Sequence, residues 1–594
     1  MGCSRHDPPL VGVSLRTQTE GYMTRLICVT VAFLGMVAFT SGPVAEGSGG
    51  QSATPRSFVL DEATIPDLQA ALEDHKINSK QLVKMYLERI EAYQSLLNPF
   101  ITINPDAVDQ AHDLDVERAH KHIRGPLHGI PIVLKDNNLT TGLPTSGGAL
   151  AFKGYVPPYQ ATLVNKLVDA GAIILGKTVL TELANWVSDD MPGNYSAVGR
   201  YGYNPYDPRA DPRPGNDVRG YPFADGRPAM STGGSSSGIA TTANLAAANI
   251  GTETSGSILS PSNQNMLVGI KPTVGLVSRH GVIPITADQD TAGPMARDVA
   301  SAAIMLGVVA GPDPLDTPAF MGPPACPAVD YTAHLDPRGL VGAHIGVAKE
   351  YYDTSNAATK AAIDAATADL TAAGATVAHV SIPSFDALQA WGICAAREQK
   401  KGNDTNCSVV LKYGMKRDFN NFVASLGPSA PLHSLSELRN FNVAHDNPTD
   451  NAIKYGQARL DISDEMDVAA DFARYVADRT KDIMLAGTNG IDAALASGPY
   501  DALLFAGSRG ADIAARPGYP SVTVPYTFIP NEPTPAFPAG FNAKPQPLGM
   551  TFTATACTEP TLIRLAYAFE QATHKRVTPF SAPPLKTDFK GNKK

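Results

Sequence analysis

Apolar positions along this chain follow two periods. Some recur every three to four residues, which is typical of helices with one buried face, and others form short runs typical of buried strands. The first pattern predicts helices at Ile65–His75, Ser79–Gln94, Val164–Ala170, Ala357–Ala373 and Ser463–Met484. The second predicts strands at HGIPIVLKDN (128–137), AIILG (172–176), Ile345–Ala348, Thr376–Ile382, Ala502–Phe505, Ser521–Pro525 and Met550–Ala554. Strands alternating with helices predict an α/β fold with a largely buried mixed β-sheet.

Two proline-rich stretches interrupt this pattern. Gly311–Val329 and Pro525–Pro547 lack a regular apolar period. We predict that both are long surface loops rather than linkers between domains. No internal repeat is evident.

The first 50 residues do not follow the globular pattern. Met23 opens a segment with a basic Arg25, an apolar run at Leu26–Phe39, and then small and polar residues. This is the layout of a secretory signal peptide, and the apolar run is short for a membrane span. We expect residues 1–50 to be a tail with a signal peptide near residues 23–45, and the protein to be periplasmic or secreted. An uncleaved anchor is the main alternative, and the start at Met1 or Met23 stays open.

Composition excludes several partners. The 594 residues carry a formal net charge of −9, with no basic run. Nucleic acid and acidic membrane surfaces are therefore not expected partners. The six cysteines include no CxxC pair, so no structural zinc site is expected. Cys394 and Cys407, 13 positions apart, are the expected disulfide partners in an oxidising compartment.

The most informative chemistry lies in Met230–Pro284. Two serine–glycine clusters, Gly233–Gly238 and Thr254–Ser257, are joined by an Ala/Asn-rich segment. Serines among glycines let the backbone turn sharply and present its N–H groups to a ligand. One short loop can thus supply a hydroxyl nucleophile and an oxyanion hole. A flexible linker is the plain alternative, but the apolar residues after the second cluster favour packed core.

Two other motifs compete with this interpretation. Gly171–Thr178 matches the P-loop pattern, but its residues 172–175 (AIIL) are expected in a buried strand, which cannot cradle phosphate. Gly234–Gly238 matches the G-x-S-x-G nucleophile elbow of an α/β-hydrolase-type esterase, with Ser236 as nucleophile. That elbow needs a preceding apolar strand, and residues 226–232 (GRPAMST) lack strand character. The histidines downstream that could complete its triad are His280, His433, His445 and His574.

A third interpretation needs no histidine. Lys135 ends the apolar run at residues 130–134, where an ammonium group is costly unless it is used or paired. Burial lowers the pKa of a lysine, so a neutral amine can act as a base while a serine relays the proton. The alternative is a lysine paired with Asp136 or another acid.

At these residues the chain resembles the amidase signature family. The similar segments include GIPIVLKDN, GAIILGKTVLTELANW, NPYDP, STGGSSSG, GTETSGSILSPSNQNMLVGIKPTVGLVSRHGVIPI, DQDTAGPMARDVASAA and PGYPSVTVP. The resemblance runs from about Ile65 to Pro579. It implies the amidase signature fold, a mixed β-sheet sandwiched between layers of helices, in a single catalytic domain at residues 57–585. A polar C-terminal tail is expected at residues 586–594.

The resemblance also implies a Lys–cis-Ser–Ser triad. Lys135 would be the base, Ser235 the bridging serine, and Ser257 the nucleophile that forms the acyl-enzyme. The oxyanion hole would be formed by backbone amides of Thr254, Ser255, Gly256 and Ser257. Ser257 follows Ser235 by 22 positions, fewer than the family pattern, so it stays open whether Ser235 or Ser236 is the relay. Where the family has two glycines before the nucleophile, this chain has Ser255–Gly256.

The activity implied is that of an exported hydrolase acting on linear amides other than peptide bonds. It would convert a carboxamide to a carboxylate plus ammonia or an amine, with no cofactor and no metal. The similar segments favour the peptide-amidase-like branch, with small-molecule or peptide amides as substrates and a monomer or homodimer as the state. A catalytically inactive binding protein is the alternative from another class. An apparent insertion, Ala210–Pro228, is expected to border the substrate entrance.

Overall fold

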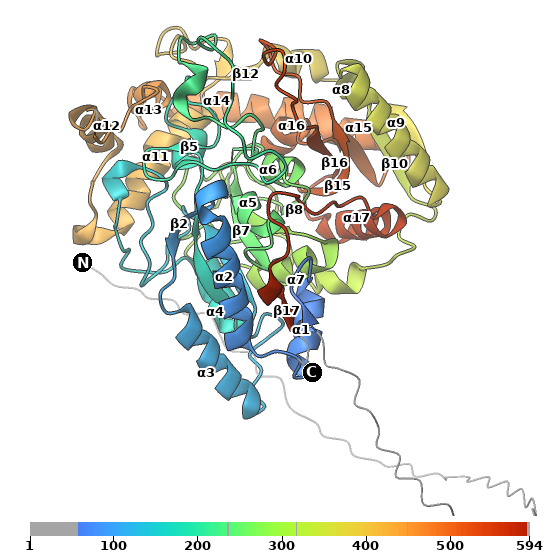
Figure 1. Cartoon of the computed structure of the whole chain (residues 1–594). Coiled ribbons are helices and arrows are strands. Elements are labelled where there is room, and N and C mark those ends of the chain that lie inside the picture. Colours follow the sequence, from blue (N-terminus) through green and yellow to red (C-terminus); the bar gives the residue numbers. More distant parts are fainter. Residues whose placement is uncertain (1–57, 235–236, 317, 448, 591–594) are drawn as a thin grey trace, which may run out of the picture. The chain divides into compact units, whose positions relative to one another are not determined.

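A large mixed β-sheet flanked by helices forms the core, which confirms the predicted fold class (Figure 1). The computed structural model describes residues 58–234, 237–316, 318–447 and 449–590, all within one unit, Pro55–Lys594. The N-terminal tail with the expected signal peptide lies outside the described residues. The described strands of the sheet are, in spatial order, β11 (Thr376–Val380), β10 (His344–Ala348), β14 (Ala502–Ala506), β16 (Gln546–Thr553), β15 (Ser521–Ile529), β8 (Val268–Lys271), β9 (Thr291–Ala296), β7 (Ala248–Glu253), β3 (Pro131–Lys135), β4 (Ile173–Thr178) and β2 (Phe100–Ile103).

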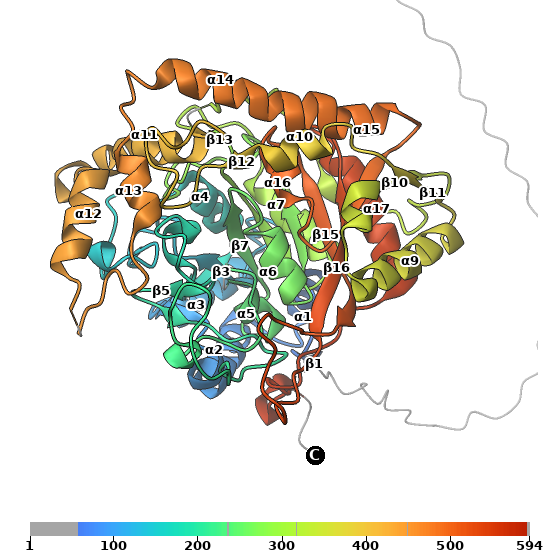
Figure 2. The ribbon, with the colours of Figure 1, turned by 90° about the horizontal axis from the view of Figure 1, so that it is seen from above.

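The helices cover this sheet and extend beyond it (Figure 2). Their bounds are α1 (Ile65–Glu73), α2 (Ser79–Leu97), α3 (Ala107–Ala119), α4 (Thr162–Asp169), α5 (Ser237–Thr242), α6 (Leu259–Gln264), α7 (Val299–Val309), α8 (Lys349–Asp353), α9 (Ala357–Ala372), α10 (Phe385–Ala390), α11 (Val410–Ser425), α12 (Leu435–Ala444), α13 (Ala458–Asp464), α14 (Phe472–Ile483), α15 (Ala493–Ala496), α16 (Ala511–Ala515) and α17 (Glu559–Thr573). Helices α7, α9 and α17 pack on the sheet, and α6 packs against β8, β15 and β16. The described helices include none long and apolar enough to cross a membrane.

The strand order at the centre of the sheet positions the candidate site. Strand β3 runs parallel to both of its neighbours, β4 and β7. The C-terminal ends of β3 and β7 therefore meet at one edge of the sheet. Lys135 is the last residue of β3, and the second serine–glycine cluster follows β7 directly.

Local capping explains where the first helices begin. The Thr64 side chain accepts a hydrogen bond from the Asp67 N–H, and the Asp67 carboxylate accepts one from the Thr64 N–H. Asn78 and Gln81 form the same reciprocal pair at the start of α2. Each pair satisfies N–H groups that have no partner inside the helix.

The helix predicted at Ser463–Met484 is two helices in the structure. Helix α13 ends at Asp464, and α14 begins at Phe472 before continuing as a π-helix over Met484–Asp492. Between them the Asp467 side chain accepts hydrogen bonds from the N–H groups of residues 469 and 470. This local turn competes with helix formation. The apolar period continues across the turn, so it predicts one helix where the backbone forms two.

Two predictions of irregular segments need correction. The loop predicted at Pro525–Pro547 is shorter, because β15 continues to Ile529 past an irregularity at Pro525 and β16 begins at Gln546. The polar tail predicted at residues 586–594 is not a tail at residues 586–590. There β17 (Phe589–Lys590) pairs with β1 (Phe58–Val59).

Two disulfides cross-link the loops. Cys394–Cys407 confirms the predicted pair, which joins the short parallel strands β12 (Gly392–Ile393) and β13 (Cys407–Ser408). Cys326–Cys557 was not predicted, and it ties the proline-rich loop at Gly311–Val329 to the segment after β16.

Candidate active site

The amine of Lys135 lies at the end of β3, inside the protein. The Lys135 residue is 1% exposed. Its Nζ donates hydrogen bonds to the Oγ1 (2.9 Å) and the carbonyl oxygen (3.1 Å) of Thr252 in the neighbouring strand β7. Burial lowers the pKa of Lys135 from 10.5 to about 8, against the opposing charges of Asp290 and Glu253. A neutral amine is therefore accessible near neutral pH.

The acid next to Lys135 in the sequence is paired with a different lysine. Asp136 lies 3.2 Å from the Nζ of Lys177 and accepts hydrogen bonds from Ser146. Lys135 forms no ion pair with any described residue. Lys177 belongs to the P-loop-like pattern Gly171–Thr178, which forms the buried strand β4 and not a phosphate-binding loop, in agreement with the sequence argument.

The second serine–glycine cluster forms the loop between β7 and α6. Ser257 is half-buried and lies two residues before α6. The Glu253 carboxylate accepts hydrogen bonds from the N–H groups of Ile258 (2.7 Å) and Leu259 (2.9 Å), which fixes the chain just beyond Ser257. The N–H groups of residues 255–257 donate to no acceptor in the described part of the chain. They are therefore available to an oxyanion.

A buried acid holds Thr254 in this loop. The Thr254 hydroxyl donates a hydrogen bond to Asp290, whose other oxygen accepts from the N–H groups of Ile285 (2.8 Å) and Thr286 (2.9 Å). Burial raises the pKa of Asp290 to about 7, although these hydrogen bonds favour its ionised form. Asp290 therefore fixes the backbone that precedes Ser257 and adds charge near Lys135.

Two glycines bring the first cluster against the second. Gly233 and Gly234 have φ angles of +81° and +88°, in the left-handed region that favours glycine. A Cβ on Gly233 would lie 2.3 Å from the backbone nitrogen of Pro261 in α6, so no larger residue fits there. The Gly234 carbonyl accepts hydrogen bonds from the N–H (3.0 Å) and the hydroxyl of Thr181.

The two serines proposed as relay follow these glycines in the sequence. Ser235 and Ser236 lie outside the described residues. The chain before them, residues 226–232, forms no strand. The elbow of an α/β-hydrolase therefore lacks the strand that should precede Ser236.

A cavity of about 340 Å³ lies where these segments meet. It is lined by Lys135, by Gly233–Gly234 of the first cluster, by Ser255–Ser257 of the second, and by residues from the segments 184–185 and 508–512. The structure thus brings Lys135 and Ser257 to one cavity, together with the free N–H groups beside Ser257. Thr254 lies behind this surface, with its side chain turned to Asp290.

One wall of the cavity has a strained backbone. Leu183, Ala184 and Asn185 have φ angles of 44°, 54° and 76°, three consecutive left-handed residues without a glycine. Such a conformation costs about 1–2 kcal/mol per residue, and strain of this kind clusters at functional sites. The sequence carries no signal for it.

The insertion Ala210–Pro228 contributes no residue to the described lining of this cavity. The insertion contains a short Asp-x-Arg repeat, in which each aspartate accepts hydrogen bonds from the N–H and guanidinium of the arginine two residues on. The pairs are Asp211–Arg213, Asp217–Arg219 and Asp225–Arg227. Local ion pairs therefore fold the insertion on itself.

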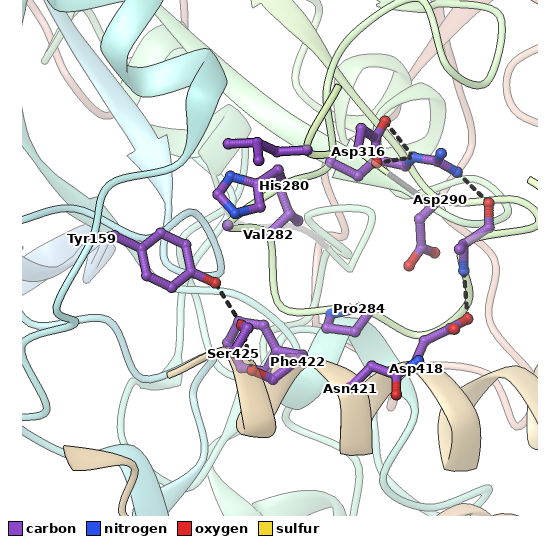
Figure 3. Close-up of a pocket in the computed structure, with 14 residues that line it drawn as sticks. Tyr159, His280, Val282, Pro284, Asp290, Asp316, Asp418, Asn421, Phe422 and Ser425 are labelled. Carbon is purple, nitrogen blue, oxygen red and sulfur yellow. Dashed lines mark hydrogen bonds and ion pairs between the residues drawn. The ribbon is translucent and has the colours of Figure 1, made fainter. Parts of the chain in front are cut away.

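Asp290, which holds Thr254, lines a different cavity of about 190 Å³ (Figure 3). There His280 stacks on Tyr159 with ring centroids 5.0 Å apart, and Arg279 forms an ion pair with Asp316 (3.1 Å). The described lining of the Lys135 cavity contains no histidine. In the part of the chain that the structure describes, no group of three side chains could hold a metal ion.

Sequence reasoning missed three buried polar residues that organise the site. Thr252 holds the Lys135 amine, Glu253 fixes the chain after Ser257, and Asp290 holds Thr254. Their signal is a polar side chain within an otherwise buried segment, because buried polar groups are kept only when they are hydrogen-bonded, paired or used.

Comparisons with known proteins agree with this geometry. The amidase family model matches residues 81–563. A probable amidase of Arabidopsis thaliana is 33% identical over 539 residues, covering 90% of this chain and 94% of the relative. The structure of the peptide amidase of Stenotrophomonas maltophilia is 38% identical with a TM-score of 0.74, covering 87% of this chain and 98% of that one. An amidase family protein of Bacillus anthracis is 29% identical with a TM-score of 0.71, covering 88% and 92%. The chain therefore belongs to the amidase family, and this membership supports a hydrolase that acts on carbon–nitrogen bonds.

Proposed function

We propose that this protein hydrolyses carboxamides through an acyl-enzyme on Ser257. The observation that carries the proposal is the shared cavity. The Lys135 amine, which has no acidic partner among the described residues, and the free N–H groups of residues 255–257 line the same space as Ser257. Membership of the amidase family supports amide hydrolysis as the reaction.

The proposed reaction begins when the Ser257 Oγ attacks the carbonyl carbon and its proton passes through Ser235 to the neutral Nζ of Lys135. The tetrahedral oxyanion accepts hydrogen bonds from the free N–H groups of residues 255–257, each donor worth about 3–4 kcal/mol. The C–N bond breaks as Lys135 returns the proton to the nitrogen, and ammonia or an amine leaves. Water then attacks the ester carbon with Lys135 as base, which releases the carboxylate and regenerates the Ser257 hydroxyl.

The lining of the cavity supports compact, polar amides as substrates. Its apolar side chains are small, Ala184 and Ala511, and the rest of the described lining is glycine, hydroxyl, amide or charged groups. A long acyl chain would find little apolar area there. Peptide amides are the class we propose, and the similarity to a peptide amidase supports it.

The test is a comparison of the purified protein with its Ser257→Ala variant on a peptide amide, an aryl amide and an ester. We expect the peptide amide to be hydrolysed fastest and Ser257→Ala to lose activity on all three without loss of folding, because a single hydroxyl in a loop is removed. Activity confined to the ester and retained in Ser257→Ala would favour an esterase that uses Ser236. Amide binding without turnover would favour the inactive binding protein.

We also propose that the protein is exported. The basic, apolar and small-residue segments of residues 23–45 support a cleaved signal peptide, and two disulfides are typical of an oxidising compartment. N-terminal sequencing of protein from the native host should give a start beyond Phe39. A cytoplasmic product that retains Met23–Phe39 would refute export. Peptide mapping without reduction should find Cys394 linked to Cys407.

A further inference from the structure

The segment after β14 forms the wall of the cavity next to the oxyanion loop. Ser508, Arg509, Ala511 and Asp512 all line the cavity, at the start of α16. A Cβ built on Gly256 would lie 3.6 Å from the Cβ of Ala511, so this wall contacts the loop that carries Ser257. Arg509 and Asp512 flank Ala511, and so two opposite charges lie beside the place where the substrate carboxamide must bind.

The position of Asp512 is fixed by a buried arginine. One carboxylate oxygen of Asp512 accepts hydrogen bonds from the Nε (3.1 Å) and Nη2 (3.0 Å) of Arg516, whose side chain is 2% exposed. Arg516 also donates to the buried Asp482 (2.7 Å). A single guanidinium thus contacts both carboxylates. The Asp512 carboxylate is therefore held in place through one of its two oxygens.

The second oxygen of Asp512 remains available to a ligand. It accepts no hydrogen bond from any described residue, and the Asp512 side chain is 42% exposed. Arg509, three residues earlier and exposed, forms no ion pair with Asp512 in the described structure and donates instead to the Thr354 hydroxyl (2.9 Å). The free oxygen of Asp512 is therefore not paired with Arg509, although both residues lie on the same segment.

We propose that Asp512 binds a cationic group of the substrate, so that the enzyme prefers carboxamides that carry an ammonium or guanidinium group over neutral isosteres. This inference rests on the proposed function, and it narrows the substrate to cationic amino-acid or peptide amides. A carboxylate fixed by one oxygen and open at the other is suited to a charge-assisted hydrogen bond with such a group.

The test compares kcat/KM for two matched pairs of amides. One pair is N-acetyl-lysine amide and N-acetyl-norleucine amide, which differ in a side-chain ammonium, and the other is glycyl-norleucine amide and its N-acetylated form. We expect the wild type to prefer the cationic member of at least one pair, and Asp512→Asn to reduce that preference about tenfold, mainly through KM. Asp74→Asn is the control. Asp74 is an exposed aspartate that pairs with Lys76, and it does not belong to the described lining of the cavity. It should keep the wild-type preference.

Added salt provides a second readout. The preference for the cationic amide should fall as NaCl is raised, since the contact is partly exposed. The inference is overturned if the wild type shows no preference in either pair, or if Asp512→Asn lowers kcat/KM equally for both members. Either result can occur while Ser257-dependent hydrolysis of neutral amides continues, and so leaves the proposed function intact. If the wild type hydrolyses no amide at all, the proposed function itself is refuted.

Discussion

The pKa of Lys135 determines how much of the enzyme is active at a given pH. Burial lowers this pKa from 10.5 to about 8. At pH 7 the neutral fraction of the amine is then about 9%, compared with about 0.03% for an ordinary lysine. Because only the neutral amine accepts the proton, kcat/KM for a non-titrating amide should rise about tenfold per pH unit below this pKa and level off above about pH 8.

Two variants of Lys135 separate its role as base from a structural role. Lys135→Arg should be inactive at every pH, since a guanidinium does not release its proton in this range. Lys135→Met should also be inactive but should not be less stable at pH 7. The folded-state pKa lies below the unfolded value, so burying the amine costs stability below about pH 8, and that cost is relieved as pH rises towards 10.5. Lys135 is not the base if Lys135→Arg keeps more than a few per cent of wild-type activity. The same conclusion follows if the rise of kcat/KM with pH has its midpoint at about pH 6.5 and this midpoint moves when a histidine is substituted.

Two further variants test a neighbour of Lys135 and a buried ion pair elsewhere in the fold. Asp290→Asn should move the midpoint of the rise of kcat/KM with pH to lower pH, because the charge of Asp290 raises the pKa of Lys135. An unchanged midpoint would show that the two groups do not interact. Arg89→Met should cost about 3–5 kcal/mol in urea unfolding, because it leaves the buried Asp588 side chain without its cationic partner, and adding Asp588→Asn should recover part of the loss. Equal stability of the single and double variants would refute this account of the Arg89–Asp588 pair.

The sequence predicts several strands of the sheet well, but it misses the edge strand β2 and three consecutive central strands. Strands such as β10 and β14 are apolar runs, and their predicted and observed bounds differ by one residue. The central strands β7 (ANIGTE), β8 (VGIK) and β9 (TAGPMA) escaped prediction. Each of them contains glycine, and β7 and β9 also contain asparagine or proline, which are residues depleted in strands. Pairing on both sides and complete burial make them strands, and neither is visible locally.

The same distinction applies to the site. Lys135 and Ser257 could be found because each lies in a distinctive local segment. Asp290 could not, because it reaches Thr254 through the pairing of β7 with β9, which sets Glu253 opposite Thr291. The disulfides show the same difference between local and distant contacts. The predicted pair is separated by 13 residues and the missed pair by 231. Contacts between distant segments depend on sheet register, which local sequence does not specify.

The identity of the nucleophile is the central claim, and covalent labelling tests it most directly. A fluorophosphonate reacts with an activated serine and leaves an adduct that peptide mass spectrometry can place on one residue. The account predicts a single adduct on Ser257 in the wild type, with labelling strongly reduced in Lys135→Met because the base that activates the serine is gone. An adduct on Ser236, or labelling of Ser257 that is equally fast without Lys135, would contradict it.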